Sequence, residues 1–181
     1  MIITISGMPG SGKSTVAKLL AEKLGLKHYS MGDLRGKMAM EKGMTIDELN
    51  ALGEKESWTD RDADRYQQEL GRKEDDFIID GRLSWHFIPQ SCKVFLDVDK
   101  KVGAKRIFGM GRRPDERAYQ SPADALRETR KRIASDKRRY KKYYGIDPYL
   151  QKHYDLWIDT TDIPSANVAE RIVRFVRRKK G

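Results

Sequence analysis

Short apolar runs alternate along the chain with stretches in which apolar residues recur every three or four positions. The short runs are typical of buried strands, and the recurring spacing is typical of helices with one buried face. Glycine ends two of these helices, at Gly25 and Gly43. We predict strands at residues 2–5, 27–30, 77–79, 94–98 and 156–158, and helices at about 16–24, 33–42, 46–54, 60–72, 122–144 and 168–176.

This alternation predicts an α/β fold in which a parallel sheet is covered by helices on both faces. The length of 181 residues favours a single domain. No apolar run approaches the roughly 18 residues of a membrane span, and no signal peptide is recognisable. Cys92 is the only cysteine, which excludes an internal disulfide and suits a reducing compartment. We therefore expect a cytoplasmic protein.

Residues 7–14 read Gly-Met-Pro-Gly-Ser-Gly-Lys-Ser and match the pattern G-x-x-x-x-G-K-[ST] in full, between a predicted strand and a predicted helix. Glycines let the backbone curl so that its N–H groups point at phosphate oxygens, and the helix dipole faces the same anion. Lys13 can reach the β- and γ-phosphates, Ser14 can ligate Mg²⁺, and Thr15 can contact the α-phosphate. We therefore predict that ATP binds at Gly7, Gly10, Ser11, Gly12, Lys13, Ser14 and Thr15.

A second chemical signal, Asp80-Gly81-Arg82, follows the apolar run at residues 77–79. An acidic residue at the end of a core strand beside a P-loop can hold a magnesium-bound water. A strand-ending aspartate that only caps a turn would have the same sequence. Gly81 allows a tight turn, after which the Arg82 guanidinium can form paired hydrogen bonds with a phosphate.

Most of the net positive charge lies in one segment. The chain has 37 Lys and Arg against 27 Asp and Glu, and residues 100–142 alone contain 16 against 5. A local positive field suits a nucleoside triphosphate. A solvated helix face or a nucleic-acid footprint would give the same composition.

Arginines within this segment suit phosphoryl transfer. Arg132, Asp136 and Arg139 share one face of the long predicted helix, so Asp136 could orient both arginines. Oriented arginines stabilise the charge that spreads over the transferred group. Arg106, Arg112 and Arg113 precede the helix, and their stretch could form a mobile lid over bound ATP.

Further blocks complete a family pattern. They are Ser-Met-Gly-Asp at 30–33, Gly-Arg-Leu-Ser at 81–84, Glu-Thr-Arg at 128–130, Arg-Tyr at 139–140, Tyr-Gly-Ile-Asp at 144–147 and Tyr-Asp-Leu at 154–156, together with Asp60, Asp64, Arg65 and Gln67. With the P-loop, this set resembles the nucleoside monophosphate kinases, specifically the archaeal-type cytidylate kinases, from residue 1 to about residue 161. The resemblance implies a three-layer P-loop fold with a five-stranded parallel sheet, a helical acceptor-binding insertion near residues 31–73 and a short lid near residues 109–121.

The resemblance also implies roles for individual residues. The acceptor nucleotide would bind at Asp33, Arg35, Asp60, Asp64, Arg65, Gln67, Gly81 and Arg82, with Arg82 on its phosphate. Lys13, Arg106, Arg112, Arg132 and Arg139 would act on the transferred phosphoryl group, and Ser14 and Asp80 would hold Mg²⁺, through water at Asp80. The chain departs from the family at Gly36, where an arginine is common. Arg35 is one position earlier, which on a helix is a rotation of about 100°.

A monophosphate acceptor needs no general base, because its phosphate oxygen is already anionic. We therefore expect an ATP-dependent kinase that converts CMP or dCMP to the diphosphate with Mg²⁺. Alternatives are a kinase of AMP or UMP, a kinase of a small alcohol such as shikimate with Asp33 as base, and a nucleotide-dependent RNA-binding or assembly protein. We expect ATP and a nucleoside monophosphate as partners, no membrane or nucleic acid, and a monomer.

Overall fold

Five parallel strands form one sheet in the order β2-β3-β1-β4-β5 in the computed structural model, which describes residues 1–56, 58–111, 114–116 and 118–180. Ile3 of the central strand β1 pairs with Ile78 of β3 on one side and Cys92 of β4 on the other. The strands are β1 (Ile2–Gly7), β2 (Lys27–Ser30), β3 (Phe77–Asp80), β4 (Cys92–Asp97) and β5 (Leu156–Asp159). The predicted α/β fold with a five-stranded parallel sheet is confirmed.

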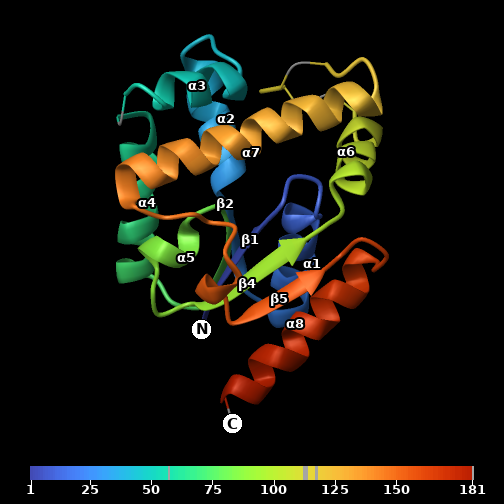
Figure 1. The fold of residues 1–181 in the computed structure, drawn as a ribbon. Coiled ribbons are helices and arrows are strands. Elements are labelled where there is room, and N and C mark those ends of the chain that lie inside the picture. The colour runs from blue at the N-terminus through green and yellow to red at the C-terminus, as the bar shows by residue number, and fades with distance from the viewer. Residues whose placement is uncertain (57, 112–113, 117, 181) are drawn as a thin grey trace.

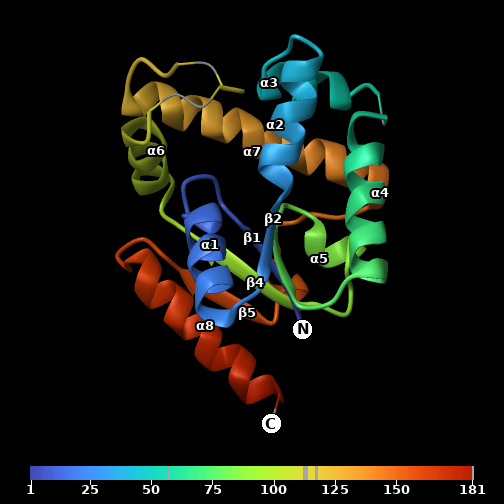
Figure 2. The same ribbon diagram turned by 180° about the vertical axis from the view of Figure 1, so that it is seen from behind.

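Helices cover both faces of the sheet. On one face, α1 (Lys13–Leu24) and α8 (Ser165–Lys180) pack against Ile3 and Ile5 of β1 (Figures 1 and 2). On the other, α4 (Trp58–Lys73) packs against Ile2 and Ile79, and the short helix α5 (Ser84–Phe87) lies beside it. Successive side chains of a strand point to opposite faces, so the continuous apolar runs supply both core layers.

The remaining helices lie at the carboxyl ends of the strands. They are α2 (Met31–Glu41), α3 (Ile46–Gly53), α6 (Lys100–Gly109) and α7 (Pro122–Tyr144), and a 3-10 turn spans Gln151–His153. In Figure 1, α7 crosses above the sheet from α6 to α4. Among the described residues, no helix combines the length and hydropathy that a membrane crossing requires.

Sequence patterning did not predict α6. Only Gly103 and Ala104 are buried in this helix, so its apolar stripe is weak, and glycine in its interior argues against a helix. Asp99 begins the helix by accepting hydrogen bonds from the backbone N–H groups of the next turn. Gly103 is needed for packing, because a Cβ there would lie 2.8 Å from the carbonyl oxygen of Pro9 in the P-loop.

Candidate active site

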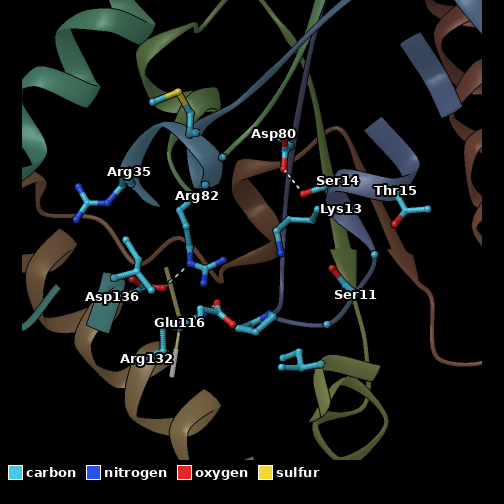
Figure 3. A pocket seen from close by; sticks show the side chains of 18 of the residues that line it. Ser11, Lys13, Ser14, Thr15, Arg35, Asp80, Arg82, Glu116, Arg132 and Asp136 are labelled. Atoms are coloured by element: carbon cyan, nitrogen blue, oxygen red, sulfur yellow. Dashed lines mark hydrogen bonds and ion pairs between the residues drawn. The ribbon is translucent and has the colours of Figure 1, made fainter. Parts of the chain in front are cut away.

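A cavity of about 580 Å³ lies at the carboxyl ends of the strands, between the P-loop (residues 7–14), α2, α4, α6 and α7. Figure 3 shows the P-loop side chains and Asp80 on one side and Arg35, Arg82, Arg132 and Asp136 on the other. The predicted residues in its wall are Gly10, Ser11, Gly12, Lys13, Ser14, Thr15, Arg35, Asp60, Asp64, Gln67, Asp80, Gly81, Arg82, Arg106, Arg132 and Arg139.

Three of the predicted residues that the structure describes are not part of this wall. Asp33 and Arg65 are exposed on the outer faces of α2 and α4. Gly7 lies behind the wall, where its carbonyl oxygen accepts a hydrogen bond from Arg82 Nη1 at 3.4 Å. Arg112 lies outside the described residues.

The P-loop has the curled backbone that the motif predicts. Gly10 and Gly12 have φ angles of +77° and +85°, which are strained for any side chain, and α1 begins at Lys13. The Lys13 ammonium donates to the carbonyl oxygen of Met8 at 2.9 Å. Burial lowers the pKa of Lys13 to about 7, and the positive charge of Arg82 adds to this effect. The cavity therefore disfavours a charged Lys13 as long as no anion is present.

Asp80 joins the P-loop to the end of β3. Its Oδ2 accepts a hydrogen bond from the Ser14 hydroxyl at 2.8 Å, and its Oδ1 lies 2.9 Å from His28 Nε2. Burial alone would raise the pKa of Asp80, but hydrogen bonds with His28 and Ser14 hold it below its ordinary value. The ionised carboxylate and the adjacent hydroxyl form a pair of hard oxygen ligands.

A buried carboxylate on α7 organises two arginines, but not the two that the helix face predicts. Asp136 accepts from Arg139 Nη2 at 2.9 Å, from Tyr149 at 3.0 Å, and from Arg82 Nε. The expectation that Asp136 holds Arg132 is wrong, because Arg82, which follows β3, takes that place. Burial would raise the pKa of Asp136, but the charges of Arg82 and Arg139 lower it.

Arg132 instead binds carboxylates from two other segments. Its Nη1 donates to Glu116 Oε1 at 2.8 Å, and its Nη2 donates to Asp47 Oδ1 at 2.9 Å. The helix α7 therefore presents Arg132 and Arg139 to the same cavity, although different acidic residues hold them. Burial would lower the pKa values of Arg132 and Arg139, but the neighbouring acidic groups raise both.

Arg35 reaches the cavity although it is displaced by one position from the family pattern. It donates to Asp60 Oδ1 and, from Nη2, to Asn50 Oδ1 at 3.1 Å. Arg139 Nη1 shares these two acceptors, at 3.2 and 3.1 Å. A Cβ at Gly36 would lie 2.6 Å from Asp115 Oδ2, so the Asp115 carboxylate occupies the space beside Gly36.

One face of α4 lines the far end of the cavity. Asp60, Ala63, Asp64 and Gln67 lie on it, at the spacing of neighbouring helical turns. The Gln67 amide is fixed, because its Oε1 accepts from Ser84 Oγ at 2.7 Å and its Nε2 donates to the backbone. Asp64 accepts a hydrogen bond from Tyr144 at the end of α7.

Arg106 is held by backbone carbonyl groups and makes no ion pair in the described part of the chain. Its Nη2 donates to Thr160 and Thr161 at 2.9 and 2.8 Å, and its Nη1 approaches the Gly10 carbonyl oxygen at 3.4 Å. It therefore ties the P-loop to the loop that follows β5.

Sequence reasoning missed Asn50, Glu116, Asp47, Tyr144 and the pairing of His28 with Asp80. Asn50 is 8% exposed and occurs within the apolar stripe of α3. A polar residue on an apolar helix face was a signal that could have found it. No local pattern marks Glu116, because its partner Arg132 lies 16 residues away on another segment.

Comparisons with known proteins agree with this geometry. The sequence model of the cytidylate kinase-like family matches residues 2–162. A cytidylate kinase of Archaeoglobus fulgidus is 40% identical over 181 residues, which cover 99% of this chain and 97% of that protein. A cytidylate kinase of Methanocella arvoryzae is 38% identical over 180 residues and 99% of both chains.

Solved structures share the fold at low sequence identity. A shikimate kinase from Acinetobacter baumannii in complex with shikimate has a TM-score of 0.63 and 20% identity, over 99% of this chain and 94% of that chain. An uncharacterised protein from Eubacterium ventriosum has a TM-score of 0.71 and 19% identity, over 98% of both chains. These similarities show the P-loop kinase-like fold.

Proposed function

The chain belongs to the cytidylate kinase-like family, and from this premise we propose that it transfers the γ-phosphoryl group of ATP to the phosphate of CMP or dCMP. An oxygen of the acceptor phosphate forms a new bond to the γ-phosphorus of ATP. The bond between the γ-phosphorus and the oxygen that bridges it to the β-phosphate breaks, and ADP leaves with that oxygen. The observation that carries the proposal is a P-loop facing Arg35 and Arg82 across one cavity (Figure 3). Two anionic ligands can then meet with their phosphates between Lys13 and Arg82.

Arg82 is the residue best placed for the acceptor phosphate. It follows β3 directly, Asp136 accepts from its Nε and the Gly7 carbonyl oxygen from its Nη1, and the guanidinium lies in the cavity wall beside Lys13 (Figure 3). A guanidinium fixed at one edge loses little conformational entropy when a phosphate binds the other edge. Arg132 would stabilise the transferred group, and Arg139 would position Arg82 and Arg35 through shared carboxylates.

Ser14 and Asp80 fit the role of holding Mg²⁺. Magnesium takes hard oxygen ligands and is commonly held by one or two carboxylates together with substrate phosphates. The Ser14 hydroxyl and the ionised Asp80 carboxylate lie 2.8 Å apart at the mouth of the P-loop and supply such oxygens. When bound, the ion would neutralise charge on the β- and γ-phosphates.

The small-alcohol alternative lacks its base. Asp33, the carboxylate that a shikimate-type reaction would use, is exposed and lies outside the cavity wall. A monophosphate acceptor requires no such group.

We also propose that the segment at residues 109–121 closes over ATP, with Arg112 contributing to it, and that the protein is a cytoplasmic monomer.

A coupled ADP-release assay tests the proposal. ATP and Mg²⁺ would be combined with CMP, dCMP, UMP, AMP or shikimate, and we expect the highest kcat/KM with CMP or dCMP. The Lys13→Ala variant should remain folded and lose most activity with every acceptor. Turnover of shikimate without turnover of any monophosphate would refute the proposal. Gel filtration with light scattering would test the monomer.

A further inference from the structure

The half-buried carboxyl of Asp64 lies in the cavity wall and makes no ion pair in the described part of the chain. Its Oδ2 accepts a hydrogen bond from the Tyr144 hydroxyl, and no described group donates to Oδ1. A carboxylate has about four acceptor positions. By contrast, Asp60 and Asp136 each contact two arginines. Asp64 is therefore a carboxylate whose hydrogen bonding the protein leaves incomplete.

Asp64 lies at the end of the cavity opposite to the phosphate-binding end. On α4 it follows Asp60, the partner of Arg35, by one turn, or about 6 Å. Its partner Tyr144 ends α7 and lies about 8 Å beyond Arg139 along that helix. In Figure 1, this end of α7 meets α4 on the side away from α6. An acceptor with its phosphate on the arginines would extend its base toward Asp64.

We propose that Asp64 determines base specificity by accepting a hydrogen bond from the 4-amino group of cytosine. This inference rests on the proposed function and adds to it the residue that separates CMP from UMP. Uracil has a 4-oxo group, so UMP would place one acceptor against another and leave Oδ1 of this half-buried carboxylate without a hydrogen-bond donor. Adenine carries a comparable amino group, so Asp64 by itself does not exclude AMP.

The protonation state of Asp64 gives the inference a second observable. Burial raises the pKa of Asp64 to about 6, while the hydrogen bond from Tyr144 acts in the opposite direction. The neighbouring charges are Asp60, which raises this pKa, and Arg35 and Arg139, which lower it. Above about pH 6 the carboxylate only accepts hydrogen bonds, whereas the protonated acid can donate to the 4-oxo group of uracil.

Selectivity for CMP over UMP should therefore decrease as the pH falls through about 6. The acceptor phosphate also titrates in this range, but it does so in both substrates and cancels from their ratio. In the Tyr144→Phe variant, Asp64 loses the donor that lowers its pKa, so the decrease should begin at a higher pH.

The decisive experiment compares kcat/KM for CMP and UMP in wild-type protein, Asp64→Asn and Asp62→Asn. The amide at position 64 can donate as well as accept, so the ratio of CMP to UMP efficiency should fall by about 10- to 100-fold. Asp62 is exposed on the same helix, so Asp62→Asn is the matched control and should keep the wild-type ratio. Circular dichroism and thermal unfolding would verify that each variant is folded.

The outcomes separate the two proposals. Wild-type protein that phosphorylates no monophosphate would overturn the proposed function itself. Wild-type protein that prefers CMP, together with an Asp64→Asn ratio within about twofold of wild type, would overturn the role of Asp64 alone. If Asp64→Asn does not fold, the pH dependence of the wild-type protein still tests the role of Asp64. A ratio of CMP to UMP efficiency that stays constant between about pH 5 and pH 8 would overturn it.

Discussion

ATP binding should be accompanied by proton uptake at Lys13. Burial of this side chain and the positive charge of Arg82 lower its pKa to about 7, although the charges of Asp80 and Asp136 act in the opposite direction. A bound triphosphate would place several negative oxygens against the ammonium, which favours the charged form. The pKa of Lys13 in the complex should therefore return to its ordinary range near 10.5 or above.

The size of the effect follows from these two pKa values. At about pH 8.5, a group with a pKa of about 7 is about 97% neutral, so binding should take up roughly one proton per ATP. Because the unbound form must gain this proton, the apparent Kd for ATP should rise by up to about tenfold for each pH unit above 7. Arginines contribute nothing here, since they stay charged in both states.

Calorimetric titration of MgATP at about pH 8.5, in two buffers with different heats of ionisation, measures the uptake directly. The difference in binding heat between the buffers gives the number of protons exchanged. Lys13→Met is the control, and we expect its uptake to be close to zero. Uptake well below about half a proton in wild-type protein, or equal uptake in Lys13→Met, would refute the assignment of the proton to Lys13.

Three further substitutions test other parts of the site. Arg82→Ala should raise the KM for the acceptor by about 10- to 100-fold and the KM for ATP far less; equal increases would reject its role in acceptor binding. Asp136→Ala leaves Arg82 and Arg139 without their shared buried carboxylate and should lower the free energy of unfolding by about 3–5 kcal/mol in urea titrations; a change below about 1 kcal/mol would contradict this. Gly103→Ala should raise the KM for ATP about tenfold or more by displacing Pro9, whereas Lys101→Ala, at an exposed position of the same helix, should not; similar effects from both would exclude the packing explanation.

Sequence patterning predicted the elements in which the apolar spacing and the residues at the ends of the element both fit the structure that forms. Residues 77–79 of β3 read as an unbroken apolar run, and the helix predicted at residues 122–144 has the same bounds in the structure. Its ends are marked by the Ser121 cap, Pro122 in the first turn and Gly145 in the left-handed region. The P-loop was equally predictable, because its function is carried by backbone geometry that a short motif encodes.

The partners of the charged side chains could not be predicted in the same way. Helical spacing correctly placed Arg132 and Arg139 on one face with Asp136, but it assumed that these residues satisfy one another. In the structure, Arg82 is 54 positions away in sequence and takes an oxygen of Asp136, while Arg132 binds Asp47 and Glu116. Which of several cations binds a carboxylate depends on tertiary packing, and a single sequence does not specify it.

These pairings divide the cations of the site into two kinds. Arg35, Arg82 and Arg132 each contact a carboxylate, which keeps them charged and oriented in the free protein. In the described part of the chain, Lys13 donates only to a backbone carbonyl and forms no ion pair, so burial is free to lower its pKa. Since Lys13 belongs to the motif that receives the triphosphate, its charge would appear when the ligand arrives, whereas the arginines are charged beforehand. This difference is why the proton uptake can be attributed to a single residue.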